Sequence, residues 1–129
     1  MIERFKGIDG KRKLIDSLLR QKAVHGAPEM AADLAEVATL EEFKEGDFLA
    51  KQNGEDTDMF FLLAGSVDII VNDRVLALRV AGEHVGEMSL IDTKAKRSAS
   101  IQAKETTAVA RITEPAFTGL AARHPTLWR

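Results

Sequence analysis

The sequence predicts a mainly β fold with flanking helices: a double-sheet β-roll or jelly roll of about eight strands, with N-terminal helices and a short C-terminal helix. Turn signals such as "FKEG", "NGED", "LAGS" and "VNDR" recur at short intervals after residue 39. The runs between them are rich in Phe, Leu, Val and Ile, which is typical of strands. Because so many short strands would leave open edges in one flat sheet, we expect a closed double sheet.

Residues 1–38 are predicted to form a helical segment. In "KRKLIDSLLRQKA" apolar residues recur at helical spacing, and charged residues occupy the other face. The apolar set is Leu14, Ile15, Leu18 and Leu19. Gly26 then provides a break, and Pro28 suits the first position of a second helix that carries an Ala/Leu/Val stripe.

Residues 39–112 are predicted to form the β-roll. The run "FFLL" at 60–63 reads as a strand buried on both faces. "SVDIIVNDRVLALRV" reads as a hairpin, because Asn72 and Asp73 tolerate the positive φ of a tight turn. Its apolar residues are Val67, Ile69 and Val71 on the first arm and Leu76, Leu78 and Val80 on the second. "SASIQA" and "TAVARI" supply two more strands.

Residues 113–129 are predicted to hold the C-terminal helices. Thr113 suits the N-cap of a helix through "EPAFTGLAAR", and His124-Pro125 starts another helix close to the last residue of the sequence. We therefore expect that the chain is part of a longer protein and stops before an effector domain.

Composition excludes several classes of function. The 129 residues are 45% hydrophobic and 29% charged, with a net charge of −2 and no cysteine, so disulfides, cysteine-based zinc sites and thiol catalysis are excluded. The three histidines, His25, His84 and His124, lack the spacing of metal ligands, and no G-x-S-x-G elbow is present. We therefore expect no catalytic residue, no metal and no cofactor.

The sequence also predicts the location of the chain and the surfaces that it does not contact. Its start is charged, and its longest apolar run, "MFFLLA", is far too short to span a bilayer, so we expect a cytoplasmic protein without membrane contact. Basic residues of the first helix alternate with Glu3, Asp9 and Asp16, which favours a solvated face over a nucleic-acid surface.

"HVGEMSLIDTKAKRSAS", residues 84–100, interrupts the strand pattern with residues suited to a ligand. Gly86 permits close approach of the backbone, and the turn after it can aim successive N–H groups at an anion. Arg97 can grip two phosphate oxygens, and Glu87 can accept from a sugar hydroxyl. Together they suit a cyclic ribose phosphate. The alternative is a structural ion pair or two solvated charges on a loop.

At this point the residues resemble a known family. "GEMSLID" followed by "KRSAS" resembles the phosphate-binding cassette of the cyclic nucleotide-binding domain. Upstream, "FKEGDFLAKQNGEDTDMFFLLAGSVDI" is similar to the same family, with Gly46, Gly54 and Gly65 at its turn positions. The resemblance extends from about residue 40 to residue 127.

The resemblance implies a ligand-binding set. Its members are Gly86, Glu87, Met88, Ser89, Arg97, Ser98, Ala99, Leu76 and Ile69. It implies that Glu87 accepts from the ribose 2′-OH, that Arg97 pairs with the cyclic phosphate, and that Ser89 and the backbone of 86–89 complete the phosphate cradle. Ser98 would meet phosphate or base, and Ile69 and Leu76 would form apolar walls for the base.

A narrower resemblance rests on the two ends, "MIERFKG", "GKRKLIDSLLRQ" and "RHPTLWR". These are similar to the N-terminal sensor of TIR-domain effectors in bacterial cyclic-pyrimidine (Pycsar) anti-phage systems. The resemblance implies cyclic UMP or cyclic CMP as ligand, a C-terminal TIR domain that degrades NAD, and a homo-oligomer in the full-length protein.

Two alternatives stay open at this stage. The same sensor, tuned for cyclic AMP, could be attached to a helix-turn-helix transcription regulator. A metal-dependent jelly-roll enzyme is the second alternative, and stoichiometric iron or manganese would favour it. The identity of the base is not fixed by a cassette that reads ribose and phosphate.

Overall fold

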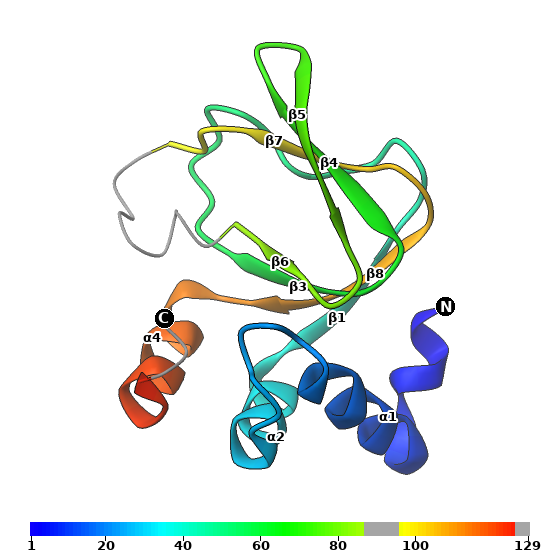
Figure 1. Ribbon diagram of the computed structural model, residues 1–129, viewed down its shortest axis with the longest axis vertical. Coiled ribbons are helices and arrows are strands. Elements are labelled where there is room, and N and C mark those ends of the chain that lie inside the picture. Colours follow the sequence, from blue (N-terminus) through cyan, green and yellow to red (C-terminus); the bar gives the residue numbers. More distant parts are fainter. Residues whose placement is uncertain (87–95, 126–129) are drawn as a thin grey trace.

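In the computed structural model, which describes residues 1–86 and 96–125, helices flank a two-layer roll of short strands (Figure 1). The N-terminal elements are the 3₁₀ helix η1 (Ile2–Phe5) and helices α1 (Gly7–Leu19) and α2 (Pro28–Val37). The strands are β1 (Thr39–Phe43), β2 (Phe48–Ala50), β3 (Met59–Ala64), β4 (Ser66–Val71), β5 (Arg74–Val80), β6 (His84–Val85), β7 (Ser100–Ala103) and β8 (Thr107–Ile112). Helix α4 (Glu114–Arg123) follows.

Helices α2 and α4 begin where the sequence predicts. Pro28 is the first residue of α2, where its missing N–H group has no helical partner to lose. Thr113 is the N-cap of α4, and its hydroxyl accepts from the N–H of Ala116 at 3.4 Å. Helix α1 starts four residues before the predicted repeat, at Gly7. None of the helices that the structure describes combines the length and apolar character required to cross a bilayer.

The strands form two antiparallel sheets, which confirms the predicted double-sheet fold. One sheet has the order β1-β8-β3-β6 and the other has the order β2-β7-β4-β5. In Figure 1 the helices lie on one side of the first sheet, and the second sheet covers its other side. The roll runs from Thr39, the first residue of β1, to Ile112, the last residue of β8.

Strand β3 lies in the first sheet and belongs to both hydrophobic clusters. Phe61 and Leu63 pack toward the helices with Leu18 and Leu34, while Phe60 and its neighbours on the same face pack inside the roll. This explains why the strand is apolar without alternation and confirms its prediction as core. Truncating such a buried phenylalanine to alanine costs about 3–5 kcal/mol.

The hairpin of β4 and β5 turns at Asn72 and Asp73, as predicted, with φ of 51° and 66°. Strand β5 is at the edge of its sheet, and three apolar residues predicted on its alternating face are exposed. These residues are Leu76, Leu78 and Val80. The alternation of apolar residues therefore predicts the strand correctly, but these apolar residues of β5 are not part of the hydrophobic core.

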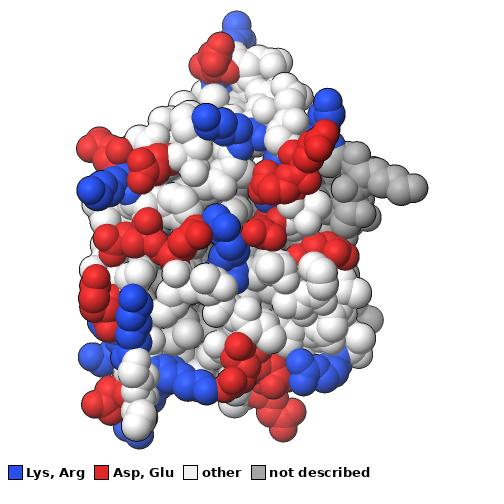
Figure 2. All heavy atoms as spheres, turned by 180° about the vertical axis from the view of Figure 1, so that it is seen from behind, with Lys and Arg blue, Asp and Glu red and all other residues white. Residues whose placement is uncertain are grey.

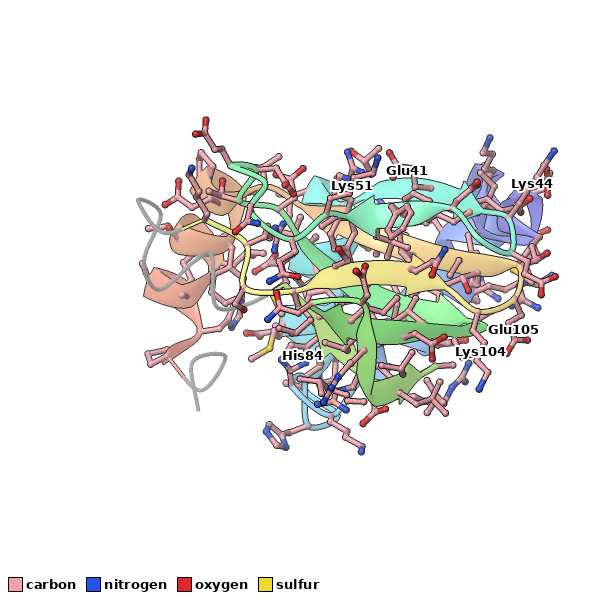
Figure 3. All side chains as sticks on the ribbon, turned by 90° about the horizontal axis from the view of Figure 1, so that it is seen from above. Glu41, Lys44, Lys51, His84, Lys104 and Glu105 are labelled. Atoms are coloured by element: carbon pink, nitrogen blue, oxygen red, sulfur yellow. The ribbon has the colours of Figure 1, made fainter. Side chains whose placement is uncertain are left out.

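The turn between β7 and β8 closes the end of the roll that lies away from α4, where Lys44, Lys104 and Glu105 gather (Figure 3). Thr107 is fully buried there, and its hydroxyl accepts from the N–H of Ser66 at 3.2 Å and lies 3.0 Å from the carbonyl oxygen of Ser66. Gly65 has φ of +88°, and a Cβ there would lie 2.5 Å from the Thr107 hydroxyl. The network at this corner also includes the carboxylate of Glu105, which accepts from the Ser66 hydroxyl at 2.6 Å.

Candidate functional site

Arg97 is anchored to the loop between β2 and β3 by its backbone. Its N–H donates to the carbonyl of Gly54 at 2.8 Å, and its carbonyl accepts from the N–H of Asn53 at 2.8 Å. The sequence predicts a strand from Ser98, directly after Arg97, but β7 begins at Ser100. The difference arises because Arg97 pairs with a loop instead of a neighbouring strand.

The Arg97 guanidinium is buried, and four of its five N–H groups donate to acceptors of the described residues. Nε and Nη2 donate to Oδ2 of Asp56 at 3.2 and 2.7 Å, Nη2 donates to the carbonyl of Asp58 at 2.5 Å, and Nη1 donates to the carbonyl of Gly86 at 3.2 Å. The Arg97 side chain is 4% exposed, while that of Asp56 is 46% exposed. A buried cation is therefore balanced by a carboxylate that reaches solvent.

Two glycines make room for this side chain. Gly86 has φ of +90°, and a Cβ there would lie 2.8 Å from the Asp58 carbonyl oxygen and 2.9 Å from Nη1 of Arg97. At Gly54 a Cβ would lie 2.9 Å from the Lys51 carbonyl oxygen and 3.1 Å from Oδ1 of Asp56. Glycine is required at both positions because the backbone passes directly beside the Arg97–Asp56 pair.

A second arginine lies close to this site. Nη2 of Arg111 is 2.7 Å from Oε2 of Glu41, and Nε of Arg111 is 3.7 Å from Oδ2 of Asp58. Its guanidinium carbon is 5.2 Å from the centre of the Phe60 ring. Asp58 thus contacts two arginines, one through its side chain and one through its main chain.

The structure brings together two residues of the predicted set, Gly86 and Arg97. Glu87, Met88 and Ser89 lie outside the described residues. Ser98 is exposed and Ala99 is half-buried in the bend before β7.

The two predicted base-wall residues lie in different environments. Ile69, on β4, packs against the interior cluster of the roll. Leu76, on the edge strand β5, is 65% exposed.

Sequence reasoning missed the acceptors of Arg97. "NGED", which contains Asp56, is interpreted in the sequence as a turn signal, and neither Asp56 nor Asp58 is assigned a role there. The available signal was a cluster of acids directly before a fully buried strand, which calls for a cationic partner. Gly54 lies at a turn as predicted, since its N–H donates to the carbonyl of Lys51 at 2.9 Å, and the positive φ of this turn belongs to Asn53, at 69°.

The polar groups considered for other chemistry have structural partners. The Ser100 hydroxyl accepts from the N–H of Gln52 at 2.8 Å. Nε2 of His124 lies 2.7 Å from Oδ2 of Asp33, and this contact joins the end of α4 to α2. Within residues 1–86 and 96–125, no group of three His, Asp or Glu side chains has the arrangement of a metal site.

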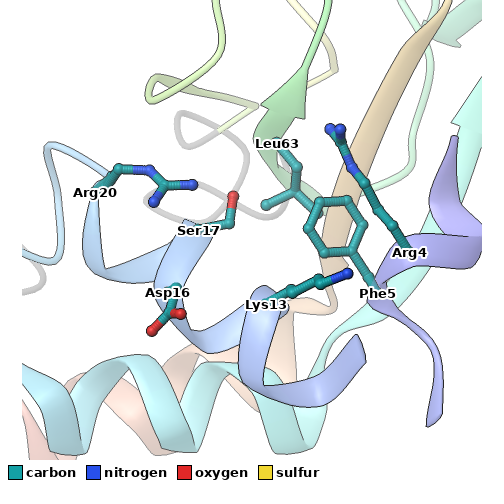
Figure 4. Close-up of a pocket in the computed structure, with 7 residues that line it drawn as sticks. All are labelled: Arg4, Phe5, Lys13, Asp16, Ser17, Arg20 and Leu63. Atoms are coloured by element: carbon teal, nitrogen blue, oxygen red, sulfur yellow. The ribbon is translucent and has the colours of Figure 1, made fainter. Parts of the chain in front are cut away.

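An open cavity of about 290 Å³ lies on the helical side of the protein, apart from Arg97 (Figure 4). Its lining residues are Arg4, Phe5, Lys13, Asp16, Ser17, Arg20 and Leu63. Lys13 on α1 and Arg20 at its C-cap lie three and four residues from Asp16, spacings at which opposite charges support a solvated helix face. On the face of the molecule in Figure 2, acidic and basic side chains of the described residues are interspersed.

Comparison with known proteins identifies the family to which the chain belongs. Residues 40–124 match the family model of the cyclic nucleotide-binding domain. The chain belongs to this family. Domains of this family bind small-molecule cyclic nucleotides. Gly86 and Arg97 lie within the matched region, in the segment that resembles the family's cassette.

This chain is similar over its whole length to bacterial effector proteins. It is 42% identical over 129 residues to the Pycsar effector protein BcPycTIR of Burkholderia cepacia and spans 43% of that protein. It is 39% identical over 129 residues to PaPycTIR of Pseudomonas aeruginosa and spans 42% of that protein. The chain therefore covers less than half the length of these relatives, and the predicted resemblance to the Pycsar effectors is confirmed.

Solved structures confirm the fold of the cyclic nucleotide-binding domain. The cAMP-bound structure of PfPKA-R (141-441) has a TM-score of 0.82 at 19% identity, over 88% of this chain and 40% of that one. PKAR CBD2 bound to Sp-2Cl-cAMPS has a TM-score of 0.80 at 19% identity, over 88% of this chain and 77% of that one. At this identity the likeness concerns the fold.

Proposed function

We propose that this domain senses a 3′,5′-cyclic mononucleotide and that Arg97 pairs with its cyclic phosphate. The observation that carries the proposal is a buried guanidinium, 4% exposed, that donates to the carbonyl of Gly86, the first residue of the cassette pattern. In the structure the anionic partner of Arg97 is the half-exposed carboxylate of Asp56, and a phosphate can accept charge-assisted hydrogen bonds of the same strong kind. The domain itself performs no chemistry in this proposal.

The cassette residues beyond Gly86 complete the proposed site. Glu87 accepts from the ribose 2′-OH, Ser89 and the main chain of 86–89 bind the phosphate, and Met88, Ser98 and Ala99 line the ligand. These roles rest on the family resemblance of "GEMSLID" and "KRSAS". Ile69 faces the interior of the roll and is the better placed of the two proposed base walls.

We infer that the ligand is cyclic UMP or cyclic CMP and that binding activates a C-terminal TIR domain that degrades NAD in anti-phage defence. The support is 42% identity over 129 residues to a Pycsar effector protein named PycTIR. Helix α4 follows β8 directly, so a ligand that prefers one position of α4 shifts the chain beyond it. Activation in the full-length protein proceeds through a homo-oligomer in this proposal.

Isothermal titration with cyclic UMP, CMP, AMP and GMP tests the ligand. We expect tight binding of one cyclic pyrimidine and none of linear 5′-UMP, which lacks the cyclic phosphodiester. Preference for cyclic AMP would instead favour the regulatory domain of a transcription regulator. Failure of all four ligands to bind would overturn the proposed function.

Substitution of Glu87 tests how the ribose is recognised. Glu87→Gln should reduce the preference for the ribose ligand over its 2′-deoxy analogue, because a carboxylate is the stronger acceptor. Glu45→Gln, an equal charge change at an exposed residue before β2, is the matched control. An unchanged ribose preference in Glu87→Gln would show that Glu87 has another role.

A further inference from the structure

The cavity on the helical side of the protein is formed where η1, α1 and β3 meet (Figure 4). One wall is apolar, because it consists of Phe5 of η1 and Leu63 of β3, which are only 6% and 7% exposed. Gly10 fixes this wall: a Cβ there would lie 2.4 Å from the carbonyl carbon of Phe5, so η1 and α1 pack backbone to backbone. The shape of the cavity is therefore set by main-chain packing.

Three basic side chains surround the apolar wall. The guanidinium carbon of Arg4 is 4.9 Å from the centre of the Phe5 ring, so a cation–π contact holds this side chain at the cavity. Lys13 and Arg20 come from α1 and its C-cap, about two helical turns apart, and both line the cavity. Cations from two elements therefore converge on one space.

The carboxylates of the protein leave these cations available. Asp16 is the acid among the lining residues, and within the described part of the chain it forms no ion pair with them. Two lysines near them in the sequence, Lys11 and Lys22, are paired with Glu36 and Glu83. The lining thus has three positive charges and one negative charge, although the whole chain has a net charge of −2. An excess of positive charge at a cavity favours an anionic ligand.

Ser17 adds a buried hydroxyl to this lining. The residue is 7% exposed, and its side chain points into the cavity between Arg20 and Leu63 (Figure 4). Within residues 1–86 and 96–125 this hydroxyl has no hydrogen-bond partner. Because buried hydroxyl groups are nearly always hydrogen-bonded, its partner comes from the cavity. An oxyanion there would accept from Ser17 and from the arginines beside it.

We propose that this cavity binds a small phosphate monoester through Arg4, Ser17 and Arg20. A phosphate monoester carries a charge of about −1.5 to −2 at pH 7, which matches the excess of positive charge, whereas a carboxylate or a phosphodiester carries about −1. The volume of about 290 Å³ is close to the lower limit of small-molecule pockets, about 300 Å³. It accommodates one ring or a short alkyl group, packed on Phe5 and Leu63, beside the phosphate.

This site lies apart from the cassette and goes beyond the proposed function. The Arg97 guanidinium contacts the carbonyl of Asp58, directly before the first residue of β3, whereas Leu63 is next to the last residue of that strand. About 16 Å of extended chain separates the two positions. A cyclic nucleotide and a phosphate monoester can therefore bind to the same molecule.

NMR titration with phenyl phosphate at constant ionic strength tests the site. We expect saturable shifts of the Ser17 and Leu63 amide resonances, with a Kd of about 1 mM. Arg4→Ala and Arg20→Ala should each weaken binding about tenfold, because a charge-assisted hydrogen bond is lost. Arg12→Ala, which removes an exposed arginine of α1 outside the cavity, is the matched control and should leave the Kd unchanged. Equal weakening by all three variants would indicate nonspecific attraction and overturn the inference.

A second series of ligands tests the chemical class and separates this site from the proposed function. Inorganic phosphate lacks the apolar group, and methyl phenyl phosphate lacks the second negative charge, so each should bind about threefold or more weakly than phenyl phosphate. Absence of saturable binding, or equal affinity for phenyl phosphate and either of the other two, would overturn the inference. Shifts confined to Gly86 and Arg97 would also overturn it, because the phosphate would then lie in the cassette. No cyclic nucleotide is present, so failure of the proposed function leaves these results unaffected.

Discussion

The two ends of strand β7 hold two different kinds of buried polar network. After β7, the Thr107 hydroxyl and the main chain of Ser66 satisfy one another, and Gly65 lets the backbone approach them. Before β7, the Arg97 guanidinium is satisfied by two main-chain carbonyls and by the side chain of Asp56. Both ends rely on a positive-φ glycine and on main-chain acceptors.

The difference lies in the charge of the buried group. The Thr107 hydroxyl and the main chain of Ser66 are neutral groups held by the strands, so their hydrogen bonds stabilise the roll. The Arg97 network contains a buried charge whose carboxylate partner, Asp56, is 46% exposed. A buried charge with a half-exposed partner is therefore what distinguishes the proposed binding end of this roll from its structural end.

The largest expected effect comes from removing Arg97. Arg97→Ala should lower cyclic nucleotide affinity by at least about 100-fold, or roughly 2.7 kcal/mol, because the charge-assisted hydrogen bonds to phosphate are lost. Titration calorimetry measures the change. Arg74→Ala, which removes an exposed arginine at the start of β5, should leave affinity unchanged. Equal affinities of Arg97→Ala and the wild type would remove Arg97 from the site.

A substitution at Gly86 tests whether the proposed binding end, which holds Arg97, depends on this glycine. Gly86→Ala should lower the free energy of unfolding by about 2–4 kcal/mol, because a Cβ would press on the Asp58 carbonyl and on Arg97, and should also weaken binding. Gly46 is the matched control, with φ of +91° and nothing within 4 Å of an added Cβ. Gly46→Ala should cost about 1 kcal/mol, from backbone strain alone. Equal losses in urea unfolding would mean that the close approach at Gly86 is unimportant.

Thr107 tests the structural end. Thr107→Val should lower the free energy of unfolding by about 1–3 kcal/mol, because the buried main chain of Ser66 loses its hydroxyl partner, and affinity should not change. Thr107→Ser keeps the hydroxyl and should retain more of the stability. Thermal and urea unfolding give the stability, and titration gives the affinity. A large loss of affinity at unchanged stability would contradict the division between the two ends.

The smallest expected effect is on pH dependence at the contact of α2 and α4. The hydrogen bond from His124, and then the charge of Arg123, hold the pKa of Asp33 below its ordinary value of 3.8. A lowered pKa in the folded state means that this contact stabilises the protein above that value and is lost as the pH falls through the lower folded value. Asp33→Asn should therefore differ in stability from the wild type at pH 5 and converge with it near about pH 2.5.

A control variant shows whether the dependence of stability on pH is specific to Asp33. Asp9→Asn changes an exposed carboxylate in the first turn of α1 and should follow the wild-type profile of stability against pH. Urea unfolding between pH 5 and pH 2.5 measures all three proteins. If the difference between wild type and Asp33→Asn stayed constant over this range, ionisation of Asp33 would not be the cause of the stabilisation.

Much of the candidate site was predictable from local sequence. Gly86 and Arg97 were recognised because "GEMSLID" and "KRSAS" resemble the phosphate-binding cassette of a known family, whereas their spacing alone also fits a structural ion pair. Asp56 was not recognised, because it lies 41 residues from Arg97 and looks locally like part of a polar turn. Which of the neighbouring acids reaches the guanidinium depends on how the loop between β2 and β3 folds over it.

By itself, the sequence determined the order and type of the elements. The helical repeats, Pro28, Thr113, the Asn72-Asp73 turn and the doubly apolar strand β3 are local features, and local backbone and burial preferences are enough to fix them. Only the tertiary structure decided which apolar residues are covered and which charges meet. Leu76 is exposed and Arg97 is paired with Asp56 because both outcomes depend on closure of the roll, which brings distant segments together and leaves one edge uncovered.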